Sequence, residues 1–330
     1  MIYNTFALPA TADRYIVVTD KQQLLDLIAE GSLSNTPFFI LGGGSNVVFT
    51  SHYRGTILHL ENKGIQLLGT DSSTGDLLIE AAAGEEWDAF VHHCIANHWH
   101  GAENLTAIPG TVGASPVQNV GAYGVEAKNV IYSVCAFDIF TGQERIFTNE
   151  ECQFAYRNSI FKGALRNHYI IWSVVFRLHK VFAPDLQYKA LSDALQSACI
   201  KNPTPQQLAD IITEVRWRKL PRPEQMGSAG SFFKNPVVSV EQYERLKSLY
   251  PDIVAYSVSD GYKLAAGWLI EKAGWKGRDM GRCGVYEKQA LVLVNRGGCS
   301  GSEVLALADA VTDDVQKLFG VILEKEAIII

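Results

Sequence analysis

The segment Ser228–Pro236 concentrates groups that could take part in catalysis. It places the hydroxyl of Ser231 after small residues and before two phenylalanines, and the ammonium of Lys234 and the amide of Asn235 follow directly. Small residues let a backbone pass close to a flat ligand, and Lys and Asn side chains bind charged and polar groups. The segment alone allows Ser231 to be an acid, a nucleophile or a turn residue.

Two glycine-rich stretches could bind phosphate groups. Gly42-Gly43-Gly44-Ser45-Asn46 directly follows a predicted buried strand at 38–41, and the second stretch runs from Pro109 to Gly124. Neither matches the Gly-x-Gly-x-x-Gly or Walker pattern, but successive backbone N–H groups can bind pyrophosphate without a lysine. The second stretch is too long and too rich in small residues for a helix or strand. The two loops together predict a large dinucleotide ligand.

Three further groups of residues are candidates for chemistry. Arg157 follows an aromatic ring at Tyr156, a pairing suited to binding a carboxylate. Glu324 and Glu326 lie in an apolar C-terminal run that reads as a strand, and strand alternation turns both the same way, so the sequence does not choose between them. The histidines at 92, 93, 98 and 100 have no zinc-ligand spacing, so we predict a solvated helix face and no metal site.

The order of the predicted elements indicates the α+β class. Strands are expected at 77–81, 169–178 and 290–294. Helices are expected after Asp20, around Trp87, from Pro205, at 264–271 and from Ser302. Capping-box patterns at Asp20/Gln23 and Thr204/Gln207 mark two of the helix starts. A Pro- and charge-rich segment, 216–223, marks a boundary, so we expect domains at 1–65, 66–216 and 217–330.

Composition restricts the class of protein. A chain of 330 residues is expected to form two or three domains, and a net charge of −6 argues against binding to nucleic acid or anionic membranes. No apolar run is long enough to span a bilayer, and the first residues do not resemble a secretory signal. The six cysteines form no Cys-x-x-Cys pair, so we expect reduced thiols and a cytoplasmic protein.

Five ordered motifs resemble those of the UDP-N-acetylenolpyruvoylglucosamine reductases. They are Leu41–Val47, Ile108–Gly110 with Val117–Gly124, Phe154–Lys162, Ser228–Pro236 and Lys263–Ile270. The resemblance extends from about Asn4 to Glu326. It implies a two-subdomain FAD-binding unit of the vanillyl-alcohol-oxidase type, followed by a C-terminal α+β substrate-binding domain.

The resemblance also implies a reaction. NADPH would reduce FAD, and the flavin would then pass hydride to UDP-N-acetylglucosamine enolpyruvate, giving UDP-N-acetylmuramate for peptidoglycan synthesis, and hence for cell wall biogenesis, cell shape and cell division. Ser231 would give a proton to the resulting enolate, while Arg157 and Glu326 would stabilise the charge on its carboxylate. Glu326 would do so best when protonated, which an apolar strand favours.

Binding roles are implied residue by residue. The residues expected to bind FAD are Gly42, Gly43, Gly44, Ser45, Asn46, Pro109, Gly110, Gly113, Ser115, Gln118, Asn119, Gly121 and Ala122. Those expected to bind the UDP-sugar are Tyr123, Tyr188, Lys219, Asn235 and Gln289. Tyr188 matches a tyrosine on the substrate loop of the longer subclass of this family. Relatives with covalent flavin carry histidine where this chain has Ser45, so FAD should be noncovalent.

Two other functions compete with the reductase. A flavin oxidase using oxygen on the same FAD unit would reoxidise without the UDP-sugar. A nucleotide-sugar sensor would need no flavin and consume no NADPH, and the set Arg157, Ser231 and Glu326 weighs against it because a sensor needs no proton donor. No obligate protein partner is indicated.

Overall fold

The computed structural model describes residues 1–330, and the chain divides into two compact units. Unit 1 consists of Met1–Thr11, Gly44–Tyr53 and Trp217–Ile330, and unit 2 of Ala12–Gly43 and Arg54–Arg216. Both units combine helices with sheets, which confirms the α+β class. The domain limits expected at residues 65 and 216 stay predictions.

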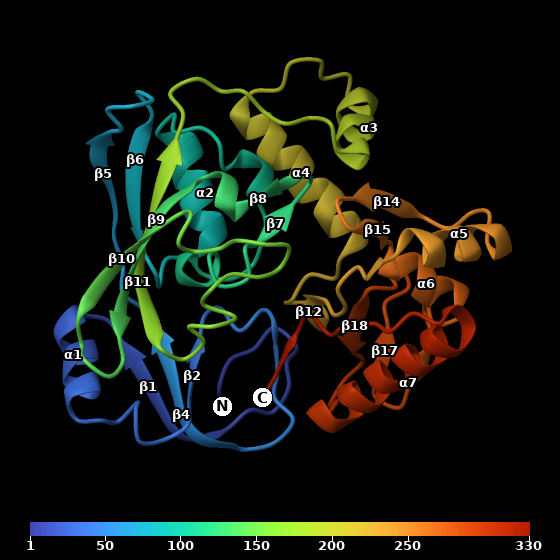
Figure 1. Cartoon of the computed structure of the whole chain (residues 1–330), viewed down its shortest axis with the longest axis horizontal. Helices are drawn as coiled ribbons and strands as arrows, with labels where there is room; N and C mark the ends of the chain where they lie inside the picture. Colours follow the sequence, from blue (N-terminus) through green and yellow to red (C-terminus); the bar gives the residue numbers. More distant parts are fainter. The chain divides into compact units, whose positions relative to one another are not determined.

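The main sheet of unit 2 has five antiparallel strands in the order β10-β9-β11-β6-β5 (Figure 1). Their bounds are β5 Ile65–Thr70, β6 Leu77–Ala82, β9 Ile131–Asp138, β10 Glu144–Thr148 and β11 Tyr169–Leu178. Helix α2 (Trp87–Ala96) buries Trp87, Phe90, Val91, Cys94 and Ile95, the apolar stripe that its spacing predicts. The rings of Phe90 on α2 and Phe176 on β11 are 4.5 Å apart, so the helix covers this sheet.

A smaller three-stranded sheet, in the order β1-β4-β2, precedes the main one in the sequence. Its strands are β1 Ala12–Val18, β2 Phe38–Leu41 and β4 Tyr53–Leu60, and helix α1 spans Lys21–Ala29. The backbone N–H of Gln23 donates to the Asp20 carboxylate at 2.9 Å, so Asp20 caps the helix as predicted. Strand β2 pairs in parallel with β4. Its last residue, the buried Leu41, directly precedes the first glycine loop.

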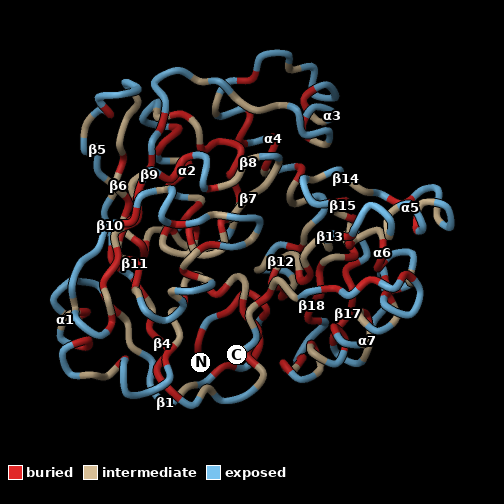
Figure 2. The backbone as a smooth tube through the Cα atoms, in the orientation of Figure 1, coloured by how far each residue is buried: buried red, intermediate tan, exposed pale blue.

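Unit 1 contains a four-stranded sheet in the order β12-β18-β17-β16 and a three-stranded sheet in the order β13-β15-β14. Its strands are β3 Val47–Val48, β12 Gly227–Ser231, β13 Val237–Val238, β14 Ala255–Val258, β15 Gly261–Leu264, β16 Asp279–Met280, β17 Cys283–Val285, β18 Val292–Asn295 and β19 Ile328–Ile329. Its helices are α5 Val240–Leu249, α6 Ala266–Lys272 and α7 Gly301–Phe319. Buried and exposed residues alternate along α7 (Figure 2), which packs on this unit's core through residues such as Val304 and Val311.

Two helices close unit 2 after β11. Helix α4 (Pro205–Lys219) begins with the predicted capping box, in which Thr204 and Gln207 bond reciprocally at 2.9 and 3.2 Å. It continues past Arg216 to Lys219, so the expected interruption of the pattern at 216 was wrong, and the helix ends only before Pro221. Helix α3 (Lys189–Ser197) was not predicted, because its N-cap Tyr188 offers no capping side-chain bond.

Several predicted boundaries shift in the structure. Leu264 pairs with Ala255 in β15, so α6 begins two residues later, at Ala266. The last helix begins at Gly301, because Ser300 rather than a later serine is its N-cap. Within the second glycine stretch, a short 3-10 turn η2 (Val112–Ala114) and the pair β7 (Gly121–Ala122) and β8 (Val125–Glu126) form where only a loop was expected.

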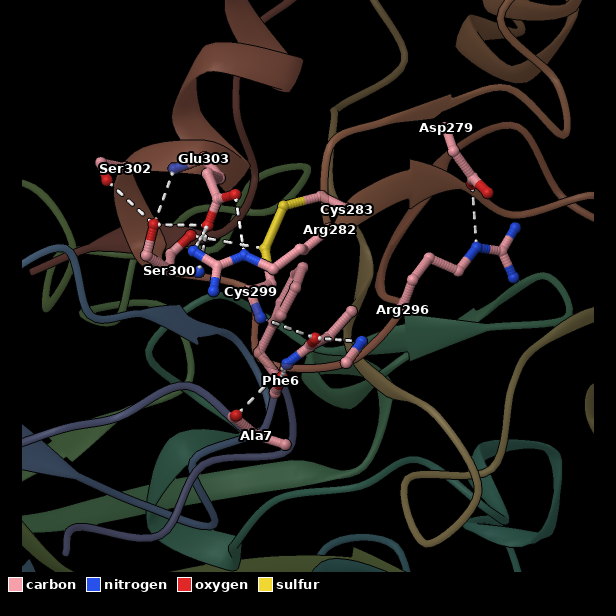
Figure 3. Close-up of a disulfide and its surroundings, with 12 residues drawn as sticks. Phe6, Ala7, Asp279, Arg282, Cys283, Arg296, Cys299, Ser300, Ser302 and Glu303 are labelled. Atoms are coloured by element: carbon pink, nitrogen blue, oxygen red, sulfur yellow. Dashed lines mark hydrogen bonds and ion pairs between the residues drawn. A yellow bond between two sulfur atoms is a disulfide. The ribbon is translucent and has the colours of Figure 1, made fainter.

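The expectation of six reduced cysteines was wrong for two of them. Cys283 and Cys299 form a disulfide with a Cα–Cα distance of 5.9 Å (Figure 3). Antiparallel pairing of β17 with β18 sets Cys283 opposite Asn295, whose side-chain oxygen accepts the backbone N–H of Cys299 at 3.1 Å. The pairing of β17 with β18 therefore brings the two cysteines together, and the spacing of cysteines along the sequence does not reveal this pairing. None of the helices combines the length and hydropathy needed to cross a bilayer.

Candidate functional site

Ser231 lies at the end of β12, where the strand is irregular. The register of β12 with β18 shifts between Ser228 and Ser231, and Gly230 within the shift has a φ of +68°. Such a bulge redirects the following side chain. Phe232 is fully buried, and its backbone N–H donates to the carbonyl of Leu291 at 2.7 Å, which fixes the chain directly after the serine. Ser231 itself stays partly exposed, as a group that meets a ligand must.

The structure brings Glu326 alongside the serine segment. Its backbone N–H donates to the carbonyl of Phe232 at 2.8 Å, and Lys325 forms an antiparallel bridge with Phe233. The Asn46 side chain donates to the carbonyl of Glu326 at 3.3 Å, and the backbone N–H of Ile328 donates to Asn46 at 2.9 Å. Glu326 is therefore held between the serine segment and the end of the first glycine loop, within unit 1.

The two glutamates of the C-terminal run have different surroundings. The carboxylate of Glu324 pairs with the ammonium of Lys234, and its side chain is 70% exposed. Glu326 is only partly exposed. This contrast is consistent with Glu326, which the resemblance implies and which strand alternation does not distinguish from Glu324, and its catalytic role stays a prediction. The ion pair with Glu324 gives Lys234 a structural partner.

Asn235 and Gln289 both reach the start of α6. The side-chain oxygen of Asn235 accepts the backbone N–H of Ala266 at 2.9 Å. The side-chain oxygen of Gln289 accepts the N–H of Leu291 at 3.3 Å and lies so close to Gly267 that an added Cβ there would approach it to 2.9 Å. Leu291 also accepts the N–H that follows Ser231, so these contacts link the predicted substrate-binding amides to the serine segment.

Arg157 lies over the second glycine loop of unit 2. One Nη atom donates to the carbonyl of Gly121 at 3.0 Å, and the guanidinium is 5.5 Å from the ring of Tyr156. Arg157 has a φ of +53°, which is uncommon for a residue with a Cβ and points to a constrained position. The predicted pairing of a guanidinium with an aromatic ring is therefore present, half-buried beside β7.

The side chains of Tyr123 and Tyr188 are in contact within unit 2, although the two residues are 65 positions apart in the sequence. Their ring centroids are 5.4 Å apart with perpendicular planes. Burial raises the pKa of Tyr123, while the positive charge of Arg216 opposes the shift. The structure thus joins two of the predicted substrate contacts. Lys219, at the exposed end of α4, belongs to unit 1, and its predicted contact stays a prediction.

Arg216 is a candidate that the sequence reasoning missed. Burial lowers the pKa of its guanidinium, and the groups that interact with it electrostatically are Tyr123, Asp88 and Arg157. Arg216 is only partly exposed, and removing a guanidinium from water is costly unless anionic groups compensate it. Arg216 is assigned to the predicted domain boundary at 216–223, because charged residues and two prolines follow it in the sequence. The helical spacing after Ile212 and Val215 could have indicated that it turns inward.

The glycine loops of unit 2 pack closely enough to exclude side chains. A Cβ on Gly43 would lie 3.0 Å from the Cα of Gly110, and one on Gly42 would lie 2.9 Å from the Thr111 hydroxyl. A Cβ on Gly113 would meet Ala83 at 2.6 Å. Backbone that carries no side chain can approach a pyrophosphate directly. These residues therefore fit the predicted FAD. The rest of the first loop, from Gly44 to Asn46, belongs to unit 1.

Two of the predicted cofactor residues also brace their own loop. Asn119 is buried, and its amide donates to Glu126 at 2.9 Å and to the carbonyl of Ala155 at 3.1 Å while accepting from Lys128 at 2.9 Å. The hydroxyl of Ser115 donates to Val112 at 2.8 Å. These bonds give both residues a part in shaping the loop, and their contact with FAD stays a prediction.

The chain matches known families over both of its parts. Residues 222–330 match the model described as UDP-N-acetylenolpyruvoylglucosamine reductase, C-terminal domain, and residues 12–148 match the model described as FAD binding domain. The FAD cofactor and the order of an FAD-binding domain before a reductase domain are thereby confirmed.

Relatives extend the similarity to nearly the whole chain. The UDP-N-acetylenolpyruvoylglucosamine reductase of Bdellovibrio bacteriovorus is 44% identical over 328 residues, which cover 98% of this chain and 96% of that protein. The reductase of Paraburkholderia phytofirmans is 45% identical over 329 residues, covering 99% and 94%. The solved structure of the reductase from Thermus caldophilus covers 99% of this chain and 95% of that one with a TM-score of 0.66 at 21% identity, which shows a shared fold. The chain therefore belongs to the UDP-N-acetylenolpyruvoylglucosamine reductase family.

Proposed function

We propose that this protein uses NADPH to reduce UDP-N-acetylglucosamine enolpyruvate to UDP-N-acetylmuramate, a step of peptidoglycan precursor synthesis. The relatives described above carry the name of this reductase over nearly the full length of the chain. The structural observation that carries the proposal is the position of Glu326 beside the segment that contains Ser231, within the matched reductase domain.

The glycine loops would hold the flavin. FAD, when bound, accepts hydride from NADPH and passes it to the terminal carbon of the enol ether. Gly42 and Gly43 would present backbone to its pyrophosphate together with Gly110 and Gly113, because their close packing leaves no room for side chains. With serine at position 45, no histidine is present there to form a covalent flavin link.

Ser231 would supply the proton that completes the reduction. Addition of hydride to the terminal carbon leaves negative charge on the carbon that bears the ether oxygen, shared with the neighbouring carboxylate. This enolate is basic enough to take a proton from a hydroxyl, and water can then return a proton to the serine. The bulge at Gly230 and the buried Phe232 fix the direction of the hydroxyl.

Glu326 and Arg157 would stabilise the developing charge on the carboxylate. A protonated Glu326 can donate a hydrogen bond, and Arg157 offers a planar guanidinium that matches a carboxylate. Arg216 is a further cation in unit 2 beside Tyr123, and it would favour the anionic groups of the ligands. Preorganised donors of this kind each contribute about 10² to 10³ in rate.

The remaining predicted residues would hold the UDP-sugar. The side-chain oxygen of Asn235 is held by Ala266, so its amide N–H groups are the donors it can offer. Gln289 would contact the sugar next to it, Lys219 would meet the diphosphate as a point charge, and Tyr123 with Tyr188 would cover the nucleotide. We also propose a cytoplasmic location, because the reaction consumes NADPH and a nucleotide sugar.

The purified protein tests the proposal directly. We expect a yellow protein whose NADPH consumption depends on the enol ether and yields UDP-N-acetylmuramate, identified by mass. A flavin oxidase would instead consume oxygen after reduction at a rate that the UDP-sugar does not change. A protein without flavin absorbance and without NADPH consumption would contradict both enzymatic functions.

A further inference from the structure

The segment between β11 and α3, residues 179–188, is tied to residues 100–104 at several points. At its start, His100 and His179 exchange two backbone hydrogen bonds, of 2.9 and 2.7 Å. The ring of His100 then lies 5.5 Å from the ring of Phe182. Val181, Ala183, Gln187 and Tyr188 are exposed, while Phe182 and Leu186 are partly buried against the apolar residues of α3 and α4.

Asn104 makes the contact nearest to Tyr188. Its side-chain amide donates to the backbone carbonyl of Asp185 at 2.7 Å, and the Asn104 side chain is buried at 4% exposure. The Asp185 carboxylate in turn accepts the backbone N–H of Gln187 at 2.9 Å, which shapes the turn leading to the tyrosine. A buried amide needs a hydrogen-bond partner, so this bond is costly to lose.

The base that carries Asn104 is rigid. Asn104 lies in the 3-10 turn η1 (Glu103–Leu105), and the buried Glu103 carboxylate accepts from His100 at 2.8 Å and from the Gly101 N–H at 2.6 Å. The indole of the buried Trp87 donates to the carbonyl of Leu105 at 2.9 Å. The turn η1 is thus fixed to the core of unit 2, and it sets the position of the Asp185 carbonyl to which Asn104 donates.

Tyr188 is the end point of the segment. It occupies the N-cap of α3, its side chain is half-exposed, and its ring meets Tyr123 edge-on. Leu191 and Leu195 of α3 pack against α4, so the helix fixes the C-terminal side of Tyr188. The N-terminal side has Asn104 as the polar anchor closest in sequence to the tyrosine among the contacts described.

We propose that Asn104 is a positioning residue, which holds the 179–188 segment so that Tyr188 is placed against the nucleotide of the UDP-sugar. The inference rests on the proposed function of Tyr188 as a substrate contact. Asn104 touches neither the reacting atoms nor the flavin in this role. It acts through the carbonyl of Asp185 and the turn that this residue begins.

Asn104→Asp removes the donor and sets a carboxylate against a carbonyl oxygen. Its matched control is Asn149→Asp, because the Asn149 side chain in the same unit also donates to backbone carbonyls, those of Lys128 and Ile131 at 2.9 and 2.6 Å. Asn104→Ala, which removes the donor without adding charge, provides the same test if the aspartate variant does not fold.

The rate of limited trypsin digestion measures, independently of activity, how firmly Asn104 holds the segment 179–188. Lys180 lies near the start of the segment, Lys189 follows its last residue, and both are exposed. We expect cleavage at these lysines to be about tenfold faster in Asn104→Asp, from the loss of one buried hydrogen bond, and unchanged in the control variant. Equal rates in the wild-type protein and in Asn104→Asp would overturn the proposal.

Steady-state kinetics tests whether Asn104 positions Tyr188 for substrate binding. The KM for the enol ether should rise about tenfold in Asn104→Asp with kcat within about threefold, and flavin reduction by NADPH should be unchanged. In a Tyr188→Ala background the same substitution should no longer raise KM. Faster cleavage with an unchanged KM, or a KM effect that persists without Tyr188, would overturn the proposal. A wild-type protein that does not reduce the enol ether would refute the proposed function instead. The digestion would still measure how firmly Asn104 holds the segment.

Discussion

The backbone N–H of Glu326 donates a hydrogen bond to the carbonyl of Phe232 at 2.8 Å. Because Phe232 follows Ser231 directly, this bond fixes the register of the predicted proton donor against the predicted carboxylate-binding residue. The neighbouring bridge between Phe233 and Lys325 and the ion pair between Lys234 and Glu324 extend the same register. The two segments are 90 positions or more apart in sequence, so their alignment is a product of the fold of unit 1.

Substitution of Glu326 tests whether its carboxyl acts as a neutral donor. Glu326→Gln keeps a neutral donor and should retain kcat within about tenfold, whereas Glu326→Ala should lower kcat by about 10² to 10³. The matched control is Glu324→Gln, because Glu324 lies two residues away and its exposed ion pair contributes little. A glutamine variant as slow as the alanine variant would contradict the role of a neutral donor.

Substitution of Gly43 tests the FAD-binding loops. Gly43→Ala would place a Cβ 3.0 Å from the Cα of Gly110, so the loops must separate, and we expect FAD to bind at least about tenfold more weakly. Gly163→Ala is the control, because its nearest neighbour would lie 3.5 Å away, an ordinary contact. The ratio of flavin to protein absorbance after dialysis measures the effect. Full flavin occupancy in Gly43→Ala would show that the loop is not a close cofactor contact.

Reduction of the Cys283–Cys299 disulfide should destabilise unit 1. The bond closes a loop with a sequence separation of 16, for which constraint of the unfolded chain contributes about 3 kcal/mol. Urea unfolding with and without dithiothreitol should show this loss, and a Cys283→Ser/Cys299→Ser double variant should not respond to the reductant. Cys199→Ser, at an exposed free cysteine, should respond like the wild-type protein. Alkylation of both bridge cysteines in the unreduced, denatured protein would contradict the bond.

Glu303 makes the stability of α7 depend on pH. Hydrogen bonds from Arg282 and then from Ser300 lower the pKa of the Glu303 carboxyl to about 2 (Figure 3). In the unfolded chain this carboxyl takes up its proton near the ordinary glutamate pKa of 4.5. The contribution is therefore complete above that value and is lost as pH falls towards about 2. The urea midpoint should decline less in Glu303→Gln than in the wild-type protein between about pH 5 and pH 3, and equal declines would contradict the assignment.

Local patterns in the sequence predicted the elements that position the site. The apolar spacing after Trp87, the capping boxes at Asp20 and Thr204, and the strand at 169–178 all correspond to elements of the structure. These features depend on neighbours within a few residues, so periodicity and capping chemistry are enough to find them.

Non-local register could not be predicted. The different surroundings of Glu324 and Glu326, the inward position of Arg216 and the Cys283–Cys299 bond each depend on which distant strands or helices pair, and only the family resemblance distinguished Glu326 from Glu324 beforehand. Alternation gives both glutamates the same face, and a charged run before prolines resembles a linker. Contacts between distant segments of the chain decide such cases, and a single sequence does not record them.

Stopped-flow absorbance of the flavin in Ser231→Ala tests most directly whether Ser231 is the proton donor. We expect that reduction by NADPH proceeds nearly as in the wild-type protein, while reoxidation by the enol ether slows by about 10² to 10⁴, the usual contribution of a general acid. Equal slowing of both half-reactions, or reoxidation at the wild-type rate, would contradict the assignment of Ser231 as the proton donor.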